Sequence, residues 1–201
     1  MQPQGPYLLG GFSGGGLIAY EIARQLLARG EKVLAVLMLD TPAREIPKFS
    51  FGDRLSMLAQ SVRREGLGIV RQKIIGRLEW EKEKRRRREQ PADSGGNGSV
   101  NFQSQRIGQA FMRSLVRYEV PAVPVDVAVF RPKLDVKYRL GGGRMVDSHR
   151  NYVREDNFWT PHVARLQVFE VPGNHDNMVL EPNVRVLVAL LRRVIEALDK
   201  G

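Results

Sequence analysis

The stretch Gly10-Gly11-Phe12-Ser13-Gly14-Gly15-Gly16 decides the fold of this chain. The apolar run Tyr7–Leu9 precedes it, and a helical pattern over Leu17–Arg29 follows it. A strand, a glycine-rich turn with a serine at its tip and a helix, in this order, form a nucleophile elbow. Such a turn strains the serine backbone, and the Gly-x-Ser-x-Gly spacing places a glycine two residues before and two residues after Ser13 to make room.

The segments beyond the turn predict an α/β fold built on a parallel sheet. Val33–Leu39 is an unbroken apolar run, as in parallel strands that are covered on both faces. Strand character returns over Val123–Phe130 and over Leu166–Val171. Gly30 is expected to end the first helix, and a last amphipathic helix is predicted over 182–198. This order of elements is typical of an α/β sheet with an inserted helical segment.

The inserted segment, residues 44–118, differs in character from the rest of the chain. We predict charged amphipathic helix over 51–89, a flexible loop over 91–99 and another helix over about 106–118. The chain is therefore interpreted as one domain, 1–201, in three parts. Residues 1–43 hold the serine turn and the next strand, 44–118 form the insertion, and 119–201 complete the sheet.

The composition limits the function classes. With 201 residues and 42% hydrophobic residues, the chain is long and apolar enough for one globular domain. It has no cysteine, which excludes disulfides and thiolate metal sites, and we expect no metal or cofactor. No apolar run is long enough to span a membrane and no signal peptide is recognisable, so a cytoplasmic location is expected.

The net charge of +10 is concentrated in the insertion. Residues 44–89 contain 14 Lys/Arg and 7 Asp/Glu, so 14 − 7 = +7 lies in this segment, with its peak at Lys82–Arg88. Acidic residues interleave with the basic ones, as on a solvated helix face, and a docking surface for an acidic protein partner is the alternative. Nucleic acid is not an expected partner, because no aromatic residues interleave with the basic run.

Three predicted strands are followed by residues that together could perform nucleophilic catalysis. A serine hydroxyl needs a base to take its proton and an acid to orient that base. Ser13, Asp40 and His175 each follow a strand, and ligand sites of open α/β sheets lie at the carboxyl ends of the strands. Asp135, after the Val123–Phe130 strand, is the alternative acid.

The choice of base rests on the positions of the three histidines. His175 lies in a Gly-Asn-His loop after a strand, whereas His149 and His162 lie in polar stretches and are expected at the surface. A dinucleotide-binding turn is the competing interpretation, because Asp40 stands about where a ribose-binding acid would be. The glycines do not follow the Gly-x-Gly-x-x-Gly register, and such a site has no use for His175.

Taken together, these residues resemble the thioesterase domains that end nonribosomal peptide and polyketide synthases. The resemblance covers nearly the whole chain and is weakest over 44–105. The segments that carry it are Gly5–Gly15, Ala19–Glu21, Leu39–Asp40, Tyr118–Phe130, Asn157–Trp159 and Val171–His175. The family places its acid at the end of the strand after the nucleophile, which supports Asp40 over Asp135.

The resemblance implies an α/β-hydrolase-like fold with a helical lid at 44–118 and a triad of Ser13, Asp40 and His175. Gly14 would supply one N–H of the oxyanion hole. The implied partner is an acyl or peptidyl carrier domain, which presents a phosphopantetheine thioester for hydrolysis or cyclisation. The alternatives are a general esterase and a non-catalytic or weakly active carrier-binding module. The oligomeric state is not predicted.

Family members carry further strands before the nucleophile segment. We therefore expect a fold that is truncated at its amino terminus, without the second oxyanion donor that those strands supply. Loss of one such donor costs a factor of about 100 to 1000 in rate. We therefore expect that the chain is a fragment of a longer domain, that a partner supplies the missing strands, or that the activity is impaired.

Overall fold

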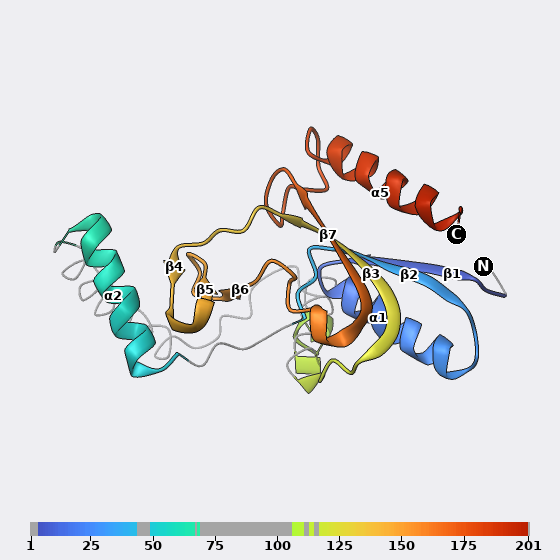
Figure 1. Cartoon of the computed structure of the whole chain (residues 1–201), viewed down its shortest axis with the longest axis horizontal. Helices are drawn as coiled ribbons and strands as arrows, with labels where there is room; N and C mark the ends of the chain where they lie inside the picture. The colour runs from blue at the N-terminus through green and yellow to red at the C-terminus, as the bar shows by residue number, and fades with distance from the viewer. Residues whose placement is uncertain are drawn as a thin grey trace, which may run out of the picture. The chain divides into compact units, whose positions relative to one another are not determined.

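The computed structural model describes residues 4–43, 49–66, 68, 106–110, 113–114 and 117–200. Within these residues the main sheet has four parallel strands in the order β1-β2-β3-β7, which confirms the predicted α/β parallel sheet (Figure 1). The strands are β1 (Tyr7–Phe12), β2 (Val33–Leu39), β3 (Val123–Pro132) and β7 (Val163–Val171).

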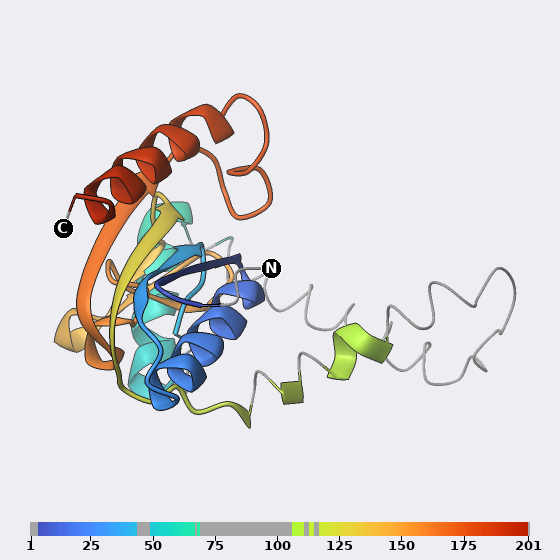
Figure 2. The same cartoon turned by 90° about the vertical axis from the view of Figure 1, so that its right-hand side faces the viewer.

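Helices α1 (Gly14–Ala28) and α5 (Val184–Leu198) cover opposite faces of this sheet (Figures 1 and 2). The core beneath α5 contains Leu187 and Val194 of the helix together with Leu37 and Phe130 of the sheet. Because both faces are covered, β2 and β3 are buried along most of their length, as the unbroken apolar sequence of β2 predicts. Gly30 ends α1 with φ 79°, a conformation that glycine adopts without strain.

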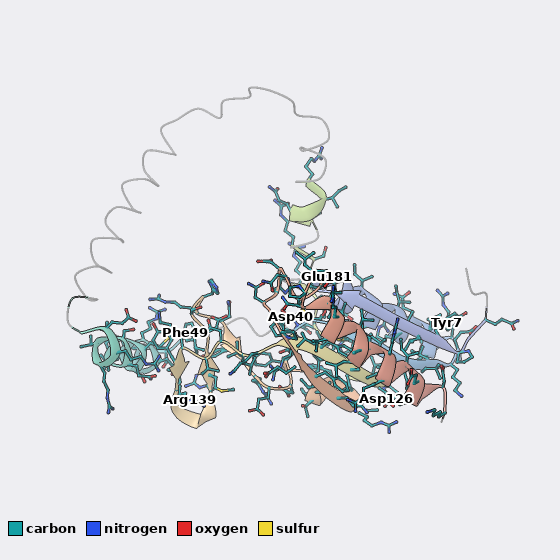
Figure 3. The ribbon with its side chains drawn as sticks, turned by 90° about the horizontal axis from the view of Figure 1, so that it is seen from above. Tyr7, Asp40, Phe49, Asp126, Arg139 and Glu181 are labelled. Carbon is teal, nitrogen blue, oxygen red and sulfur yellow. The ribbon has the colours of Figure 1, made fainter. Side chains whose placement is uncertain are left out.

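The register of the strands brings their carboxyl ends to one level. Phe12 pairs with Leu39, Leu39 pairs with Phe130, and Pro132 pairs with Val171. Figure 3 shows the result: Tyr7 at the start of β1 and Asp40 just after β2 lie at opposite ends of the sheet. The residues that follow the strands therefore gather at one edge.

A second, antiparallel sheet of three short strands lies in the connection between β3 and β7, where we predicted no strands. Its order is β4-β5-β6, and residues 141–143 form a turn of 3-10 helix between β4 and β5. Two-residue strands are too short to show a periodic pattern, which explains why the sequence did not predict them. They are β4 (Tyr138–Arg139), β5 (Met145–Val146) and β6 (Tyr152–Val153).

The described residues between 49 and 118 belong to a separate structural unit. Its helix α2 (Phe51–Glu65) begins with a capping box: Ser50 Oγ accepts from Asp53 N at 3.1 Å, and Asp53 Oδ2 accepts from Ser50 N at 3.0 Å. The helical character predicted over 51–89 is confirmed for Phe51–Glu65, where α2 ends just before Gly66 with its φ of 78°, and residues 69–89 lie outside the described residues.

The structure describes only some of the residues to which the other predictions for this unit refer. Residues 106–110 are helical, as expected. The basic run at 82–88 and the loop predicted over 91–99 lie outside the described residues. In the ranges that the structure describes, no helix has both the length and the apolar character needed to cross a membrane.

Candidate active site

The serine turn between β1 and α1 has the strained backbone predicted for it. Ser13 adopts φ 53° and ψ −125°, and it directly precedes the first residue of α1. Its N–H donates to the carbonyl of Leu39 at 2.8 Å. Its own carbonyl accepts from the hydroxyl of Thr41 at 2.7 Å and from the N–H of Gly16 at 3.1 Å. These bonds hold the turn in a conformation that non-glycine residues rarely adopt.

The glycines at this turn that have no room for a side chain differ in part from those that the motif predicts. A Cβ atom on Gly11 would overlap the backbone of Gly15, so the expectation for Gly11 is confirmed. The expectation for Gly15 is wrong, because a Cβ atom there would meet nothing within 4 Å. Instead Gly16, which lies outside the Gly-x-Ser-x-Gly pattern, is crowded by the side chain of Thr41.

Asp40 and His175, which are 135 residues apart, form a hydrogen-bonded pair. His175 Nδ1 lies 2.7 Å from Asp40 Oδ2, and the two side chains are 46% and 20% exposed. A carboxylate only accepts hydrogen bonds, so Nδ1–H is the donor and Nε2 is left with its lone pair. The ring of Phe12 stacks on the imidazole, with the centroids 4.9 Å apart. The imidazole is therefore held both at its edge and on its face.

The loop that carries His175 is fixed by its own side chains. Asn174 Oδ1 accepts from the N–H groups of Asp176 and Asn177, each at 3.0 Å. In return, Asn177 Oδ1 accepts from Asn174 N at 2.7 Å. Gly173, just before the loop, has φ 96°, and a Cβ atom there would overlap the side chain of Asn177. This set of short-range bonds makes the loop a defined turn rather than an open connection.

Ser13, Asp40 and His175 all line one hollow of about 650 Å³ at the carboxyl ends of the strands. The structure thus brings the three predicted site residues together, and Gly14 is the residue next to Ser13 at the start of α1. Other side chains in the lining come from the end of β3 and from the β3–β7 connection. They include Arg131, Lys133, Asp135, His149, Tyr152, Arg154, Asn157 and Phe158.

The alternative acid, Asp135, lines the same hollow but has a different partner. It accepts from the hydroxyl and from the N–H of Ser148, and these hydrogen bonds hold the pKa of its carboxyl below the usual value. His149 is exposed and lines the hollow. His162 is partly buried, and its carbonyl accepts from the Tyr20 hydroxyl at 2.6 Å.

Two buried residues near the serine turn were not predicted from the sequence. Thr41 and Trp159 both have no exposed surface, and Trp159 Nε1 donates to the carbonyl of Thr41 at 2.6 Å. A buried tryptophan needs an acceptor for its N–H, but nothing in the sequence indicates which one it finds. Among the described residues, no group of three or more His, Asp or Glu side chains could hold a metal ion.

The amino-terminal part of the chain is similar to known proteins. Residues 1–75 match the family described as the thioesterase domain. The chain is 46% identical over 66 residues to the non-reducing polyketide synthase atnG of Arthrinium sp, which covers 29% of this chain and 3% of that protein. It is 40% identical over 62 residues to the polyketide synthase PksR of Bacillus subtilis (strain 168), covering 31% of this chain and 2% of that protein. The matched segments thus span only a few per cent of the length of these relatives.

Solved structures share the fold at low sequence identity. The NocB thioesterase domain from the nocardicin cluster aligns with 97% of this chain and 67% of its own length, at 21% identity and a TM-score of 0.56. The surfactin thioesterase domain SrfTE aligns with 94% of this chain and 69% of its own length, at 15% identity and a TM-score of 0.52. Residues 1–75 thus match the thioesterase-domain family, and the chain shares its fold with these two solved thioesterase domains.

Proposed function

We propose that this chain is a thioesterase that releases an acyl or peptidyl chain from the phosphopantetheine thioester of a carrier domain. The observation that carries the proposal is the convergence on one hollow of Ser13, with its strained backbone, and the hydrogen-bonded pair of Asp40 and His175. A hydroxyl nucleophile, an imidazole base and a carboxylate that orients the base are the three groups that acyl transfer through serine requires.

In the first half of the proposed reaction, His175 Nε2 takes the proton of Ser13 Oγ as this oxygen attacks the thioester carbonyl carbon. The Asp40 carboxylate holds the imidazole in the required tautomer and stabilises the imidazolium that forms. The Gly14 N–H binds the oxyanion of the tetrahedral intermediate. When the C–S bond breaks, the departing thiolate takes the proton from His175, which leaves an acyl-enzyme on Ser13.

In the second half, water or a nucleophilic group of the bound chain attacks the acyl-enzyme. His175 Nε2 takes the proton of this nucleophile and returns it to Ser13 Oγ as the ester bond breaks. Water yields an acid, and a nucleophile within the chain yields a ring. Residues 44–118 are proposed as the lid that controls the access of water. Its basic charge favours an acidic carrier domain as the partner.

The direct test is turnover of an acyl-pantetheine thioester by the parent protein and by Ser13→Ala, followed as release of free thiol. We expect turnover by the parent and background release by the variant, because the proposed acyl-enzyme forms on Ser13. Unchanged turnover in Ser13→Ala would sink the proposal. A matched oxygen ester of the same acyl group separates a thioesterase from a general esterase, which would prefer the oxygen ester.

A further inference from the structure

The carbonyl oxygen of Ser13 is held by a side chain from the next strand. Thr41 Oγ1 donates to it at 2.7 Å, and the alternative acceptor of this hydroxyl, the carbonyl of Leu39, is 3.5 Å away. A hydroxyl has a single hydrogen, so the shorter contact determines its direction. The bond therefore ties the turn of the nucleophile to the residue that follows the proposed acid.

This bond also fixes the direction of the Gly14 N–H. The Ser13 carbonyl and the Gly14 N–H belong to one peptide group, which is planar and trans, so they point in opposite directions. Gly14 is the first residue of α1, and the first N–H groups of a helix have no acceptor within the helix. A hydrogen bond that fixes the Ser13 carbonyl oxygen on one side of this peptide therefore also fixes the direction of the Gly14 N–H on the other side.

Thr41 is itself held firmly. Its side chain has no exposed surface, and its carbonyl accepts from Trp159 Nε1 at 2.6 Å. Trp159 is fully buried as well, and it packs against the ring of Tyr20 with centroids 4.8 Å apart. The absence of a side chain at Gly16 leaves the space that Thr41 occupies, since a Cβ atom on Gly16 would overlap the Thr41 hydroxyl. The hydroxyl therefore cannot turn away from Ser13 without disturbing the packed core.

We propose that Thr41 is a positioning residue for oxyanion binding. Its hydroxyl orients the Ser13–Gly14 peptide so that the Gly14 N–H faces the oxyanion of the tetrahedral intermediate. The bond also polarises this peptide, which makes the N–H a stronger donor. This inference rests on the proposed thioesterase function. It assigns a role to a side chain that touches no part of the substrate.

The test compares Thr41→Val, which keeps the shape and loses the hydroxyl, with Thr41→Ser, which keeps the hydroxyl. Thr160→Val is the matched control, because it removes another side-chain hydroxyl that donates at 2.6 Å, to Asp156, outside the hollow. We expect Thr41→Val to lower kcat for an acyl-pantetheine thioester roughly tenfold to a hundredfold, short of the roughly 100- to 1000-fold loss of a whole oxyanion donor. KM should stay nearly constant. Thr41→Ser and Thr160→Val should behave like the parent.

A second readout separates oxyanion binding from a general effect on the fold. Ser13 Oγ adds to the carbonyl carbon of the trifluoromethyl ketone that carries the same acyl chain, while His175 takes the Ser13 proton, and this leaves an oxyanion on the former carbonyl oxygen. The amide of the same acyl chain forms no such adduct. In Thr41→Val, affinity for the ketone should fall by about the same factor as kcat, and affinity for the amide should not change. Trp159→Phe removes the N–H that anchors Thr41. It should lower kcat and the affinity for the ketone as well, but to a smaller extent.

Three results would overturn the proposal. Parent-like kcat and ketone affinity in Thr41→Val would show that the hydroxyl has no such role, while the proposed function would stand. Equal losses of ketone and amide affinity, measured per folded site, would assign the effect to the fold of the pocket. A parent protein without thioester turnover and without ketone binding would overturn the proposed function and the role of Thr41 with it.

Discussion

The ring of Phe12 stacks on the imidazole of His175, with the centroids 4.9 Å apart and the planes inclined by 23°. Phe12 directly precedes Ser13 in the chain, so the turn that carries the proposed nucleophile also supports the proposed base. Stacked aromatic pairs of this kind contribute about 0.5–1.5 kcal/mol beyond the area that they bury. One short segment therefore carries the proposed nucleophile and also supports one face of the proposed base.

Phe12→Ala should lower kcat/KM for the thioester about tenfold, since loss of the stacking energy lets the imidazole leave its position beside Ser13. Phe12→Tyr keeps the ring and should retain most of the activity. Steady-state kinetics of the two variants decides the point. Equal activity of Phe12→Ala and the parent would show that Asp40 alone orients the imidazole.

The identity of the acid is tested by two matched substitutions. Asp40→Asn should lower kcat by a factor of about 10⁴, because an amide no longer holds His175 in the tautomer that accepts the proton of Ser13. Asp135→Asn should have a far smaller effect, since the partner of Asp135 is Ser148. The reverse order of the two effects, measured as kcat, would move the role of the acid to Asp135.

The crowding at the serine turn predicts opposite results for two glycines of the same motif. Gly11→Ala should prevent folding or lower the free energy of unfolding by several kcal/mol, because its Cβ would overlap the backbone of Gly15. Gly15→Ala has open space inside α1 and should stabilise the protein by up to about 1 kcal/mol. Urea unfolding of both variants measures the difference, and similar losses in both would contradict the structure.

The hydroxyl of Tyr20 is a buried link between α1 and the β3–β7 connection. It lies 2.6 Å from the carbonyl of His162 and 2.9 Å from that of Pro121, and Tyr20→Phe should cost about 1–2 kcal/mol of unfolding free energy. Burial raises the pKa of Tyr20 from 10.0 to about 12.

This raised pKa predicts a pH dependence with a definite sign. The folded state holds the Tyr20 proton more tightly than the unfolded state, so its contribution is complete below pH 10 and is lost between pH 10 and about 12. Unfolding free energies of the parent should fall more steeply in this window than those of Tyr20→Phe. Parallel curves would show that the hydroxyl titrates equally in both states.

Much of the sheet could be predicted because its strands are long and apolar. Val33–Leu39 is an unbroken apolar run, and Val123–Phe130 is rich in valine, so both segments indicate strands. The residues that follow them lie at one edge because the strands are parallel. Ser13, Asp40 and His175 were therefore within reach of the sequence as a group. Their catalytic roles stay predictions.

The contacts that support Ser13, Asp40 and His175 could not be predicted from the sequence. The stacking of Phe12 on His175 and the bond from Thr41 to Ser13 join residues whose spacing in the chain shows no pattern. The spacing of the motif also does not reveal that Gly16, rather than Gly15, is the crowded glycine. Such facts depend on how neighbouring elements pack, which hydrophobic periodicity does not encode.

The central claim is that Ser13 is an activated nucleophile in this chain. The most direct measurement is the intact mass of the parent protein and of Ser13→Ala after exposure to a serine-reactive fluorophosphonate. We predict one phosphonyl adduct on the parent and none on the variant, because His175 and Asp40 activate the Ser13 hydroxyl. An unlabelled parent, or equal labelling of the two proteins, would contradict the account.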